Sequence, residues 1–370
     1  MWRICAAKGD IYKKKYKGLY CVGDEAFIKE SDLVNGKCPN HPTMDPIEVE
    51  EENYFFMLST YQDRILEYLR QPGVIVPEWR REEAIKFVEQ GLEDFSISRE
   101  SKRMNWGIPV PGDENQVMYV WFDALTNYIS TLGWPGTEGN FKTFWTEGET
   151  LQLAGKDQIR FQSIMWQGML MSAGIKTTDR VIYHGFINSG GQKMSKSLGN
   201  VIEPYAIVKE YGADALRYFL ARHVHPFDDS DVTMERFKES YNADLANGLG
   251  NVTARIMKLA ETHLESPIMR PEASGFTQEY TEALEKFDYN KALDHVWSEI
   301  QKLDQKITTT EPFKLVKTDL AAGRVLIADL ATELYITVQL LKPFMPSTAE
   351  KISAAILANK KPENLFPRKD

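Results

Sequence analysis

The chain has 370 residues, of which 43% are hydrophobic, and its formal net charge is −9 at pH 7. A chain of this length and composition buries a sizeable core in two or three domains, which excludes a fibrous or disordered protein. The acidic balance argues against a general polyanion-binding surface. Any contact with nucleic acid must therefore depend on local basic patches or on specific side chains.

Membrane and secretory segments are not expected. No stretch approaches eighteen consecutive apolar residues, and residues 1–17 carry scattered charges instead of the apolar block of a signal peptide. These features predict no membrane partner and a cytoplasmic location. Three cysteines in so long a chain argue against a disulfide scaffold and favour reduced thiols or metal ligands.

The first predicted elements follow a polar, turn-rich segment. Residues 1–48 contain all three cysteines and are interpreted as a small inserted module. From Asn53 apolar residues recur at helical spacing as far as Pro72, which predicts a helix. A second helix is predicted over 82–90, with Gly91 ending it.

The middle of the chain alternates between strand and helix patterns. Strand-like runs are found at 117–121, 150–154 and 181–186, and a helical pattern over 158–171 separates the last two. A strand, a helix and another strand predict a parallel crossover. Residues 49–188 are therefore expected to form part of a parallel α/β sheet.

Beyond about Asp231 only helical periodicity remains. Apolar residues recur every three or four positions in three stripes, over 237–259, 293–307 and 327–341. A last helix is predicted to open with a capping box in which Ser347 and Glu350 each satisfy a free backbone N–H. Residues 235–370 are therefore expected to form a helix bundle, whose apolar stripes face its core.

The most specific motif is a loop of lysines and hydroxyls. It has the sequence Lys193-Met194-Ser195-Lys196-Ser197 and follows a predicted hairpin turn at 189–192. Two ammonium groups and two hydroxyls on one short loop are typical of a phosphate clamp. The alternative, an exposed loop without a ligand, is disfavoured because five fixed residues rarely recur by chance.

The surroundings of this loop resemble a known class of enzymes. With His184-Gly185 before it and Leu198-Gly199-Asn200 after it, the loop resembles the signature of class I aminoacyl-tRNA synthetases. Segments 106–113, 120–125 and 155–161 follow the order found in one family of that class. The chain therefore resembles the methionyl-tRNA synthetases over essentially its whole length, without the large editing domain of the leucine, isoleucine and valine enzymes.

The resemblance implies ATP-dependent attachment of methionine to its tRNA through a methionyl-adenylate, with Mg²⁺ bridging the ATP phosphates. Methionine, ATP and methionine tRNA would be the partners, and residues 189–234 would hold the signature loop and a region that contacts the tRNA stem. The implied catalytic residues are Lys193, Ser195, Lys196 and Ser197. Among them, Lys196 is expected to strengthen its contact in the transition state.

The implied ATP-binding residues are Gly155, Asp157, His184, Gly185, Met194 and Lys196. Two of them have structural alternatives. Asp157 stands where it could cap the following helix, although the same carboxylate could also accept hydrogen bonds from ribose hydroxyls. His184 could be a hydrogen-bonded histidine of the strand and not a neighbour of adenine.

The implied methionine pocket is an aromatic box. Its residues are Trp121, Ala124, Leu125, Tyr128, Phe161 and Gln162. Aromatic rings suit a thioether because sulfur packs favourably at ring edges. Gln162 stands where the family usually has histidine, which replaces a ring by an amide near the substrate sulfur. For Trp121 and Tyr128 the alternative is ordinary core packing of aromatic side chains on a strand.

Two short knuckles in the inserted module have the spacing of metal ligands. Cys21 and Asp24 form one, and Cys38 and His41 form the other. Relatives have cysteine at the position of Asp24, but zinc also accepts carboxylate oxygen, so a weakened structural zinc site is predicted. The alternative is a degenerate knuckle that folds through packing alone. Cys5 belongs to no pair and is predicted to be a small buried hydrophobic residue.

The helix bundle is implied to read the anticodon. Asn251 and Arg255 are four residues apart and share a helix face, and both types suit base edges. Phe313 follows Pro312 and replaces the tryptophan that the family stacks on an anticodon base. The alternatives are a solvated helix charge for Arg255 and a core position for Phe313.

One family signature does not occur in this sequence. Class I synthetases carry a His-Ile-Gly-His motif in the first half of the nucleotide-binding fold. The chain is therefore interpreted as a C-terminal portion with an incomplete sheet, a complementary N-terminal chain as partner, and no methionine activation by itself. The competing hypothesis is a non-catalytic tRNA-binding or assembly module. Within the enzyme class a cysteinyl enzyme is the nearest alternative, which the aromatic box disfavours.

Overall fold

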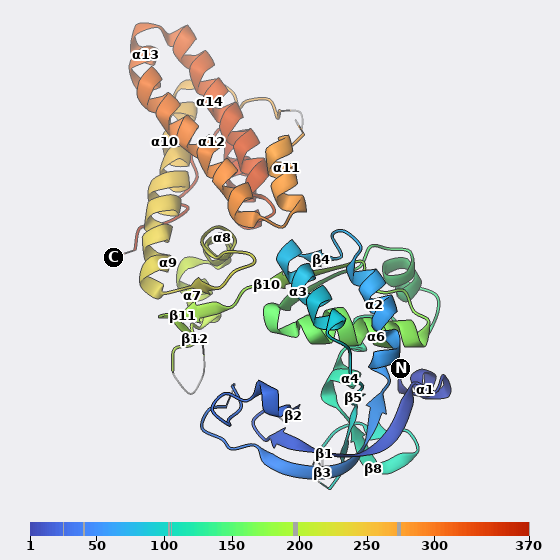
Figure 1. The fold of residues 1–370 in the computed structure, drawn as a ribbon. Coiled ribbons are helices and arrows are strands. Elements are labelled where there is room, and N and C mark those ends of the chain that lie inside the picture. Colours follow the sequence, from blue (N-terminus) through green and yellow to red (C-terminus); the bar gives the residue numbers. More distant parts are fainter. Residues whose placement is uncertain are drawn as a thin grey trace. The chain divides into compact units, whose positions relative to one another are not determined.

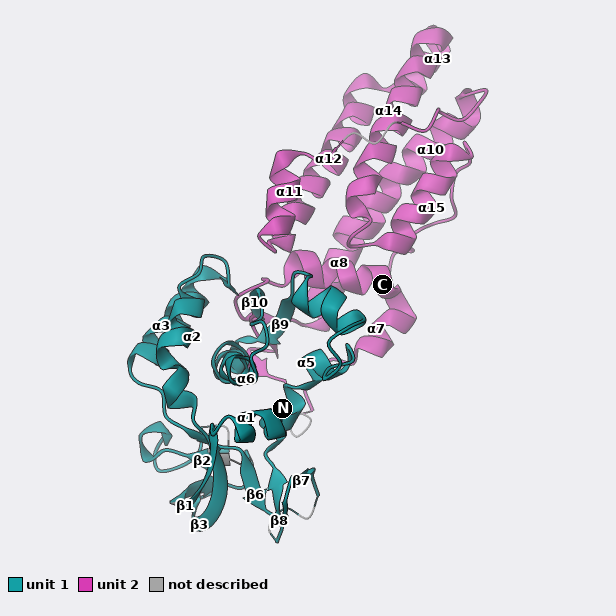
Figure 2. Cartoon of the chain, turned by 90° about the vertical axis from the view of Figure 1, so that its right-hand side faces the viewer, with its two compact units in different colours: residues 1–183 teal, residues 184–370 magenta. Residues whose placement is uncertain are grey.

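The structure is a computed structural model that describes residues 1–24, 26–39, 41–102, 104, 106–194, 199–271 and 275–369. The chain divides into two compact units, 1–183 and 184–370 (Figure 2). Unit 1 combines helices and strands, whereas unit 2 is mainly helical (Figure 1).

Unit 1 contains three small sheets among its described residues. Its elements are α1 (Trp2–Ala7), β1 (Ile11–Cys21), β2 (Ala26–Ile28), η1 (Glu30–Asp32), β3 (Ile47–Phe56), η2 (Leu58–Tyr61), α2 (Gln62–Leu69), β4 (Ile75–Val76), α3 (Glu78–Glu89), β5 (Phe95–Ser96), β6 (Ser98–Glu100), β7 (Pro109–Val110), β8 (Asp113–Met118), α4 (Val120–Ala124), α5 (Asn127–Ser130), η3 (Phe141–Thr146), β9 (Leu151–Gly155), η4 (Lys156–Gln158), η5 (Arg160–Met165), α6 (Trp166–Ala173) and β10 (Arg180–His184). The strand orders are β2-β1-β3-β5, β4-β10-β9 and β6-β8-β7.

The sheet β4-β10-β9 contains the strands predicted around residues 150–154 and 181–186. The helical run from η4 through α6 connects β9 to its neighbour β10, as the predicted order of strand, helix and strand requires, and β4 runs parallel to β10. Helix α6 packs its fully buried Trp166 and Met169 into the core of unit 1. Strand β9 lies at the edge of this sheet, and its Leu151 and Leu153 side chains are 44% and 58% exposed.

The predicted helix from Asn53 was wrong over its first residues. Residues 53–56 belong to strand β3, which pairs with β1 over ten residues and with β5 at its end. Helical structure begins only at Leu58. The strand prevails because hydrogen bonds to two neighbouring strands satisfy backbone groups that a helix would satisfy locally. Strand β3 also crosses the expected module boundary at residue 48.

The predicted strand over 117–121 was also wrong at its end. Strand β8 ends at Met118, and Val120 begins helix α4, so Trp121 is helical. The Tyr119 N–H donates to Ile97 O, and the Phe122 N–H already donates back to Tyr119 O. The helix predicted over 82–90 begins earlier, at Glu78, directly after Pro77.

Unit 2 joins a small sheet to a helix bundle. Its elements are β11 (Ile187–Ser189), β12 (Gln192–Lys193), α7 (Pro204–Tyr211), α8 (Ala213–His223), β13 (Ser230–Asp231), α9 (Met234–Ser240), the π-helical η6 (Tyr241–Gly250), α10 (Asn251–His263), α11 (Gln278–Glu285), α12 (Tyr289–Thr310), α13 (Pro312–Thr318), α14 (Leu320–Leu341) and α15 (Pro346–Leu357). The three predicted apolar stripes face one shared core, to which Leu245, Leu293 and Leu334 contribute fully buried side chains.

The predicted capping box at Ser347 was wrong. Helix α15 begins at Pro346 after Met345, and neither Met345 nor Ser347 caps it through its side chain. The Thr348 N–H donates instead to Asp214 Oδ2, at 2.6 Å. A carboxylate from another helix therefore satisfies the backbone N–H at the start of α15, which spacing within the helix cannot reveal.

Among the described residues, no helix has both the length and the apolar character needed to span a membrane.

Candidate active site and metal site

The predicted aromatic box forms within unit 1. The Trp121 ring on α4 stacks on the Phe161 ring of η5, with centroids 4.4 Å apart and planes at 22°. Both side chains are only half-buried. A stacked pair that remains accessible is less typical of core packing than of a surface that a ligand covers. Trp121 lies on a helix and not on a strand, and it packs partly buried against the core of unit 1, as does Tyr128.

A hydrogen bond joins Tyr128 and Gln162 in the box. The Gln162 Nε2 amide donates to the Tyr128 hydroxyl, and Gln162 is 4% exposed. Its Oε1 atom has no hydrogen-bond partner among the described residues. Leu125 is 2% exposed and belongs to the core, whereas Ala124 is half-buried. The predicted pocket residues therefore come from α4, α5 and η5 and the residue that follows α4, and they include one buried acceptor without a hydrogen-bond partner among the described residues.

A tyrosine behind the box is held neutral. The Tyr183 hydroxyl lies 2.6 Å from the Ser163 hydroxyl, and both side chains are fully buried. Burial raises the pKa of Tyr183. The Tyr183 hydroxyl therefore stays protonated and forms a buried hydrogen bond with Ser163.

The Gly155-Lys156-Asp157 segment spans the last residue of β9 and the first two residues of η4. Gly155 is the residue before η4, and Asp157 lies inside η4 with its side chain exposed. Asp157 does not cap the helix, and its Oδ2 accepts only a 3.2 Å hydrogen bond from Gln158 Nε2. The capping alternative was therefore wrong, and the carboxylate stands exposed beyond the end of a sheet strand, where ligands of such folds collect.

His184 and Gly185 begin unit 2. The His184 ring is exposed, and its Nδ1 lies 2.8 Å from the Gly185 carbonyl oxygen. A Cβ atom at Gly185 would lie 2.1 Å from the Asp228 carbonyl carbon, so only glycine permits this close backbone approach. His184 is thus a hydrogen-bonded residue at a strand end whose ring remains open to solvent.

The signature loop is described only at its beginning. Strands β11 and β12 form the predicted hairpin, in which Gly190 and Gly191 have φ angles of 62° and 73°. The Lys193 ammonium lies 5.2 Å from the Phe186 ring centroid. Met194 is described, whereas Ser195, Lys196 and Ser197 lie outside the described residues.

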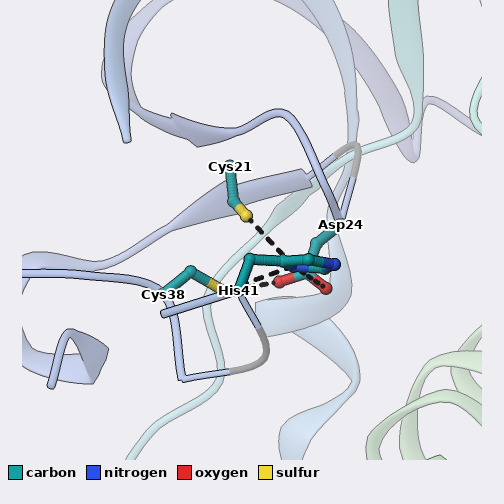
Figure 3. A group of neighbouring side chains, drawn as sticks. All are labelled: Cys21, Asp24, Cys38 and His41. Atoms are coloured by element: carbon teal, nitrogen blue, oxygen red, sulfur yellow. Dashed lines mark hydrogen bonds and ion pairs between the residues drawn. The ribbon is translucent and has the colours of Figure 1, made fainter. Parts of the chain in front are cut away.

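The predicted metal ligands come together in unit 1. The four potential ligand atoms of Cys21, Asp24, Cys38 and His41 all lie within 4.8 Å of one another (Figure 3). The Cys38 Sγ lies 2.8 Å from Asp24 Oδ2, and the Cys21 Sγ lies 3.6 Å from His41 Nδ1. Asp24 Oδ1 is 3.3 Å from the same nitrogen. Both cysteines are buried.

The donor set fits a tetrahedral zinc ion. Zn–S bonds of about 2.3 Å and Zn–N or Zn–O bonds of about 2.0–2.2 Å place ligand atoms about 3.3–3.8 Å apart. The measured separations of 2.8, 3.3 and 3.6 Å are close to this range. A Cβ atom at Gly23 would lie 2.5 Å from the His41 ring. A larger residue at this position would therefore clash with the imidazole.

The predicted anticodon residues lie in unit 2. Asn251 and Arg255 are one turn apart on α10, and the Arg255 guanidinium forms an ion pair with Asp304 of α12. Asn251 is exposed and lines a cavity of about 360 Å³ beside residues 361–368. Phe313 is 43% exposed on α13. Arg255 is thus ion-paired and not merely solvated, and Phe313 is not a core residue.

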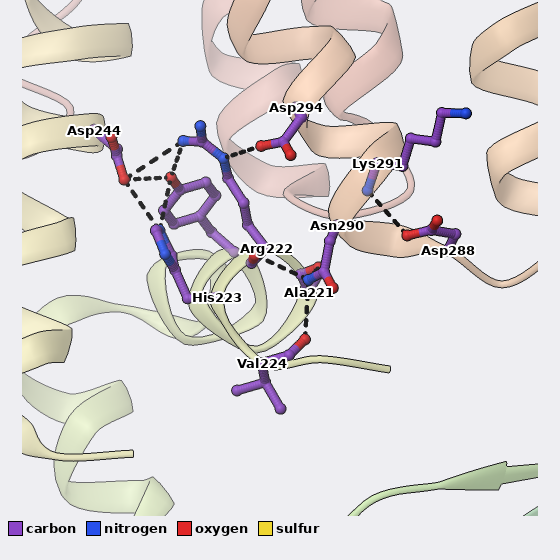
Figure 4. Close-up of polar contacts among 10 residues, drawn as sticks. Ala221, Arg222, His223, Val224, Asp244, Asp288, Asn290, Lys291 and Asp294 are labelled. Carbon is purple, nitrogen blue, oxygen red and sulfur yellow. Dashed lines mark hydrogen bonds and ion pairs between the residues drawn. The ribbon is translucent and has the colours of Figure 1, made fainter. Parts of the chain in front are cut away.

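A polar network that sequence reasoning missed joins α8 to η6 and α12 (Figure 4). The Tyr218 hydroxyl donates to Asp244 at 2.7 Å, and Arg222 Nη1 donates to the Tyr218 oxygen at 2.7 Å. Arg222 Nε donates to Asp294 at 3.1 Å, and His223 Nε2 lies 3.1 Å from Asp244. These residues are up to 76 positions apart in the sequence, from Tyr218 to Asp294, so no local spacing could indicate the network.

The network controls the charge of its central carboxylate. Burial by itself raises the pKa of Asp244, but hydrogen bonds from His223 and Tyr218 and the charge of Arg222 outweigh it. The pKa of Asp244 is therefore held below its usual range. Nearby, the Asn290 amide nitrogen lies within 3.0 Å of three carbonyls at the end of α8. The network secures α8 against the bundle.

A family model and curated relatives match this chain. The model described as tRNA synthetases class I (M) matches residues 42–257. The chain is similar to the methionine–tRNA ligase of Fusobacterium nucleatum, at 39% identity over 98% of the chain and 59% of that protein. It is similar to the Brucella suis methionine–tRNA ligase at 39% identity over 95% of the chain and 71% of that protein. The chain thus spans about three fifths of the length of the Fusobacterium protein.

Solved structures give the same result. The chain resembles the Mycobacterium tuberculosis methionyl-tRNA synthetase in complex with methionyl-adenylate, with a TM-score of 0.84 and 34% identity. The likeness covers 100% of this chain and 78% of that one. The free form of the same mycobacterial protein matches with a TM-score of 0.83 and 32% identity.

Proposed function

Because the chain belongs to the class I tRNA synthetases of the methionine type, we propose that it attaches methionine to its cognate tRNA as the C-terminal portion of the enzyme. The reaction uses ATP. The methionine carboxylate attacks the α-phosphate, pyrophosphate leaves, and the acyl group of the adenylate then passes to the 3′ end of the tRNA. A Mg²⁺ ion bound with ATP would supply positive charge that neutralises part of the phosphate charge.

The observation that carries this proposal is the accessible aromatic box. The stacked pair Trp121 and Phe161 and the polar floor Tyr128–Gln162 offer flat rings and one polar corner to a flexible thioether. If the Gln162 amide turns by 180°, its NH₂ group faces the free position and can donate weakly to sulfur, which is a poor acceptor.

The charged residues have separate roles in the proposal. In unit 1 the exposed Asp157 carboxylate accepts hydrogen bonds from ribose hydroxyls, beside Gly155. In unit 2 Lys193, Met194, His184 and Gly185 contribute to ATP binding. Ser195, Lys196 and Ser197 belong to the same phosphate-binding loop and complete its positive and hydroxyl groups. Because phosphoryl transfer depends on positioning and charge neutralisation, the lysines are the catalytic groups.

The inserted module and the bundle have supporting roles. Cys21, Asp24, Cys38 and His41 would hold a structural zinc ion, which fixes the two knuckles against each other. Asn251, Arg255 and Phe313 would read the anticodon, with the guanidinium of Arg255 positioned by Asp304 and the ring of Phe313 exposed for stacking. A cytoplasmic location accompanies this role in protein synthesis.

The edge strand β9 supports a complementary N-terminal chain as partner. Its outer position in β4-β10-β9 leaves backbone groups available for a further strand, and its Leu151 and Leu153 side chains are about half exposed. The partner chain would carry the His-Ile-Gly-His signature, pair with this edge and cover the leucines. The present chain by itself would not activate methionine.

Methionine-dependent exchange of pyrophosphate into ATP tests the proposal. The chain would be measured alone and co-purified with a chain that carries the missing signature half. We expect exchange only from the pair, and a fall in kcat/KM for methionine of at least tenfold with Trp121→Ala, because the stacked ring supplies about 1.5–3 kcal/mol of apolar contact. Normal exchange by the chain alone would contradict the need for a partner.

A second outcome would favour the binding-module alternative. If the pair forms and binds methionine tRNA but shows no exchange with any amino acid, the enzymatic proposal fails. Exchange that depends on cysteine instead of methionine would contradict the substrate assignment and leave the chemistry intact. A Phe144→Ala variant serves as a matched control, because Phe144 is 57% exposed in unit 1 and does not belong to the box.

A further inference from the structure

A short acidic segment of unit 2 supports the hairpin that carries Lys193. Its strand β13 pairs in parallel with β11, the middle strand of the sheet β12-β11-β13. The Ser230 N–H donates to Phe186 O at 2.9 Å, and the Val232 N–H donates to Asn188 O at 2.9 Å. Backbone pairing therefore holds β13 to β11 and leaves the turn of the hairpin to other contacts.

The turn of this hairpin has a backbone donor that the hairpin itself does not use. Ser189 pairs with Gln192, and Gly190 and Gly191 form the two-residue turn between them. In such a turn the N–H groups of the two central residues have no partner on the opposite strand. The Gly191 N–H donates instead to Asp231 Oδ1 at 2.7 Å. A side chain from outside the hairpin therefore holds its turn.

The Asp231 side chain reaches further along the hairpin than strand pairing does. In the register of β11 and β13, Asp231 lies opposite Asn188, which is three positions before Gly191. Its carboxylate therefore extends past the end of β11 to contact the turn. Its backbone is held as well, because Arg236 Nη1 donates to Asp231 O at 2.8 Å. Asp231 thus links the turn of the hairpin to the beginning of helix α9.

A second carboxylate of the segment supports the ring beside the lysine. Asp229 Oδ1 accepts a hydrogen bond from the Phe186 N–H at 2.9 Å. The Lys193 ammonium lies 5.2 Å from the Phe186 ring centroid, which is within the range of a cation–π contact. The segment therefore supports the backbone that leads to Lys193 through Asp231, and the ring that its ammonium contacts through Asp229.

A carboxylate beside a phosphate-binding hairpin is unfavourable unless it has another role. Asp231 is exposed, and no cation among the described residues forms an ion pair with it. Its negative charge repels a phosphate group near the hairpin. A fixed hairpin offsets this repulsion, because an ammonium that is already in place loses less freedom when it binds a ligand.

From these contacts we propose that Asp231 is a positioning residue for Lys193, which it holds at the phosphate site through the Gly191 N–H. The inference rests on the proposed function, in which Lys193 binds the phosphates of ATP. Because phosphoryl transfer depends on accurately placed charges, release of the turn should reduce phosphate affinity even though a negative charge is removed. A carboxylate without a positioning role predicts the opposite sign, since its removal reduces repulsion.

Calorimetric titration of the whole chain with inorganic tripolyphosphate tests this sign. Asp231→Ala should weaken binding roughly fivefold, which corresponds to about 1 kcal/mol. Asp231→Asn should bind at least as tightly as the wild type, because its side-chain oxygen still accepts the Gly191 N–H and the negative charge is gone. Lys193→Ala should weaken binding roughly tenfold, because it removes the ammonium itself.

A double variant shows whether Asp231 acts through Lys193. In a Lys193→Ala chain, Asp231→Ala should not weaken tripolyphosphate binding further, because the group that it positions is already gone. An equal loss in both backgrounds would show a general structural effect and overturn the inference. Asp228→Ala is the matched control, because Asp228 carries the same charge and its carboxylate lies 3.6 Å from His225 Nδ1. This variant should not weaken binding.

Denaturation midpoints check the folding of every variant. Asp231→Glu provides a second test that keeps the charge but moves the carboxylate by one methylene group, and it should weaken binding as Asp231→Ala does. Unchanged or tighter binding by a folded Asp231→Ala or Asp231→Glu chain, or no binding of tripolyphosphate by the wild type, would overturn the inference. No methionine is present in these titrations, so absence of methionine-dependent exchange would contradict the proposed function and leave this result unaffected.

Discussion

Two polar clusters in this chain hold their surroundings together in different ways. The knuckle cluster of unit 1 gathers two thiols, a carboxylate and an imidazole within 4.8 Å. The α8 network of unit 2, built around Asp244, alternates donors and acceptors. Every strong contact of Asp244 is made to a hydrogen-bond donor. The potential ligand atoms of the knuckle cluster instead mainly carry lone pairs, and these atoms face one another.

The difference shows what each cluster requires. The α8 network satisfies itself, because Tyr218, Arg222 and His223 supply the hydrogen atoms that the Asp244 carboxylate accepts. The knuckle cluster cannot do so once its cysteines are thiolates, since thiolates and carboxylate repel without a cation between them. Metal removal should therefore destabilise the knuckle cluster of unit 1, and removal of the Asp244 charge should destabilise unit 2.

The largest expected effect is loss of the metal from the knuckle. Cys38→Ser should weaken zinc binding roughly a hundredfold, because about 10–16 kcal/mol of binding energy shared by four ligands is about 3 kcal/mol each. Elemental analysis of zinc per chain and a competition titration with a chelator measure this. Cys5→Ser is the control, since Cys5 is buried outside the cluster and should cost stability without releasing zinc. Full zinc retention by Cys38→Ser would contradict the ligand assignment.

The next largest effect should follow loss of the central carboxylate of the α8 network. Asp244→Asn leaves Arg222 and His223 without their shared acceptor charge and should destabilise unit 2 by about 2 kcal/mol in denaturant unfolding. Asp329→Asn is a matched control on an exposed face of α14, and it should change the unfolding free energy little. Equal effects of the two changes would show that the network does not hold α8.

Acid should act on the same carboxylate with a smaller effect. The folded pKa of Asp244 is lowered, so its contribution is present above the unfolded pKa of about 3.9 and disappears as pH falls through the lower folded value. The stability of unit 2 should therefore decline below about pH 4. Unfolding free energies between pH 3 and pH 6 measure this, and Asp244→Asn should flatten the profile. An identical slope in that variant would assign the acid sensitivity to other groups.

The smallest effect is expected at the rim of the network. The Asp294 side chain is 66% exposed where it pairs with Arg222, so Asp294→Asn should cost no more than about 0.5 kcal/mol. High salt should reduce even this difference, because exposed ion pairs are screened. A cost equal to that of Asp244→Asn, measured by the same unfolding curves, would mean that the two acids contribute equally to the network.

Local patterns predicted a large part of both units. The knuckles follow from Cys–x–x pairs, the hairpin from Gly190-Gly191, and the bundle from apolar residues at three- and four-residue spacing. Each depends on residues close in sequence, where backbone geometry leaves few alternatives. Trp121, Phe161 and Gln162 could be expected as a site only from the family resemblance, because their spacing alone is equally compatible with a core.

Errors occurred where distant segments decide the structure. Residues 53–56 form a strand because β1 and β5 offer hydrogen-bonding edges on both sides. The last helix is capped by Asp214, which is more than a hundred positions from Thr348. The surroundings of the buried Arg99 guanidinium cannot be read from the sequence, because tertiary packing brings the Phe27 and Tyr119 rings near it and leaves its Nε without a hydrogen-bond partner among the described residues.

The sequence by itself therefore determined the family resemblance, the four knuckle residues that converge in unit 1 and the helical architecture of unit 2, because short-range spacing and residue type suffice for each. Tertiary structure alone decided which strands pair, which carboxylate ends α15, how Asp244 keeps its charge and where Arg99 remains unpaired. These outcomes depend on contacts between residues tens to more than a hundred positions apart. Local sequence patterns do not indicate the geometry of such contacts or the free energy needed to close the intervening chain.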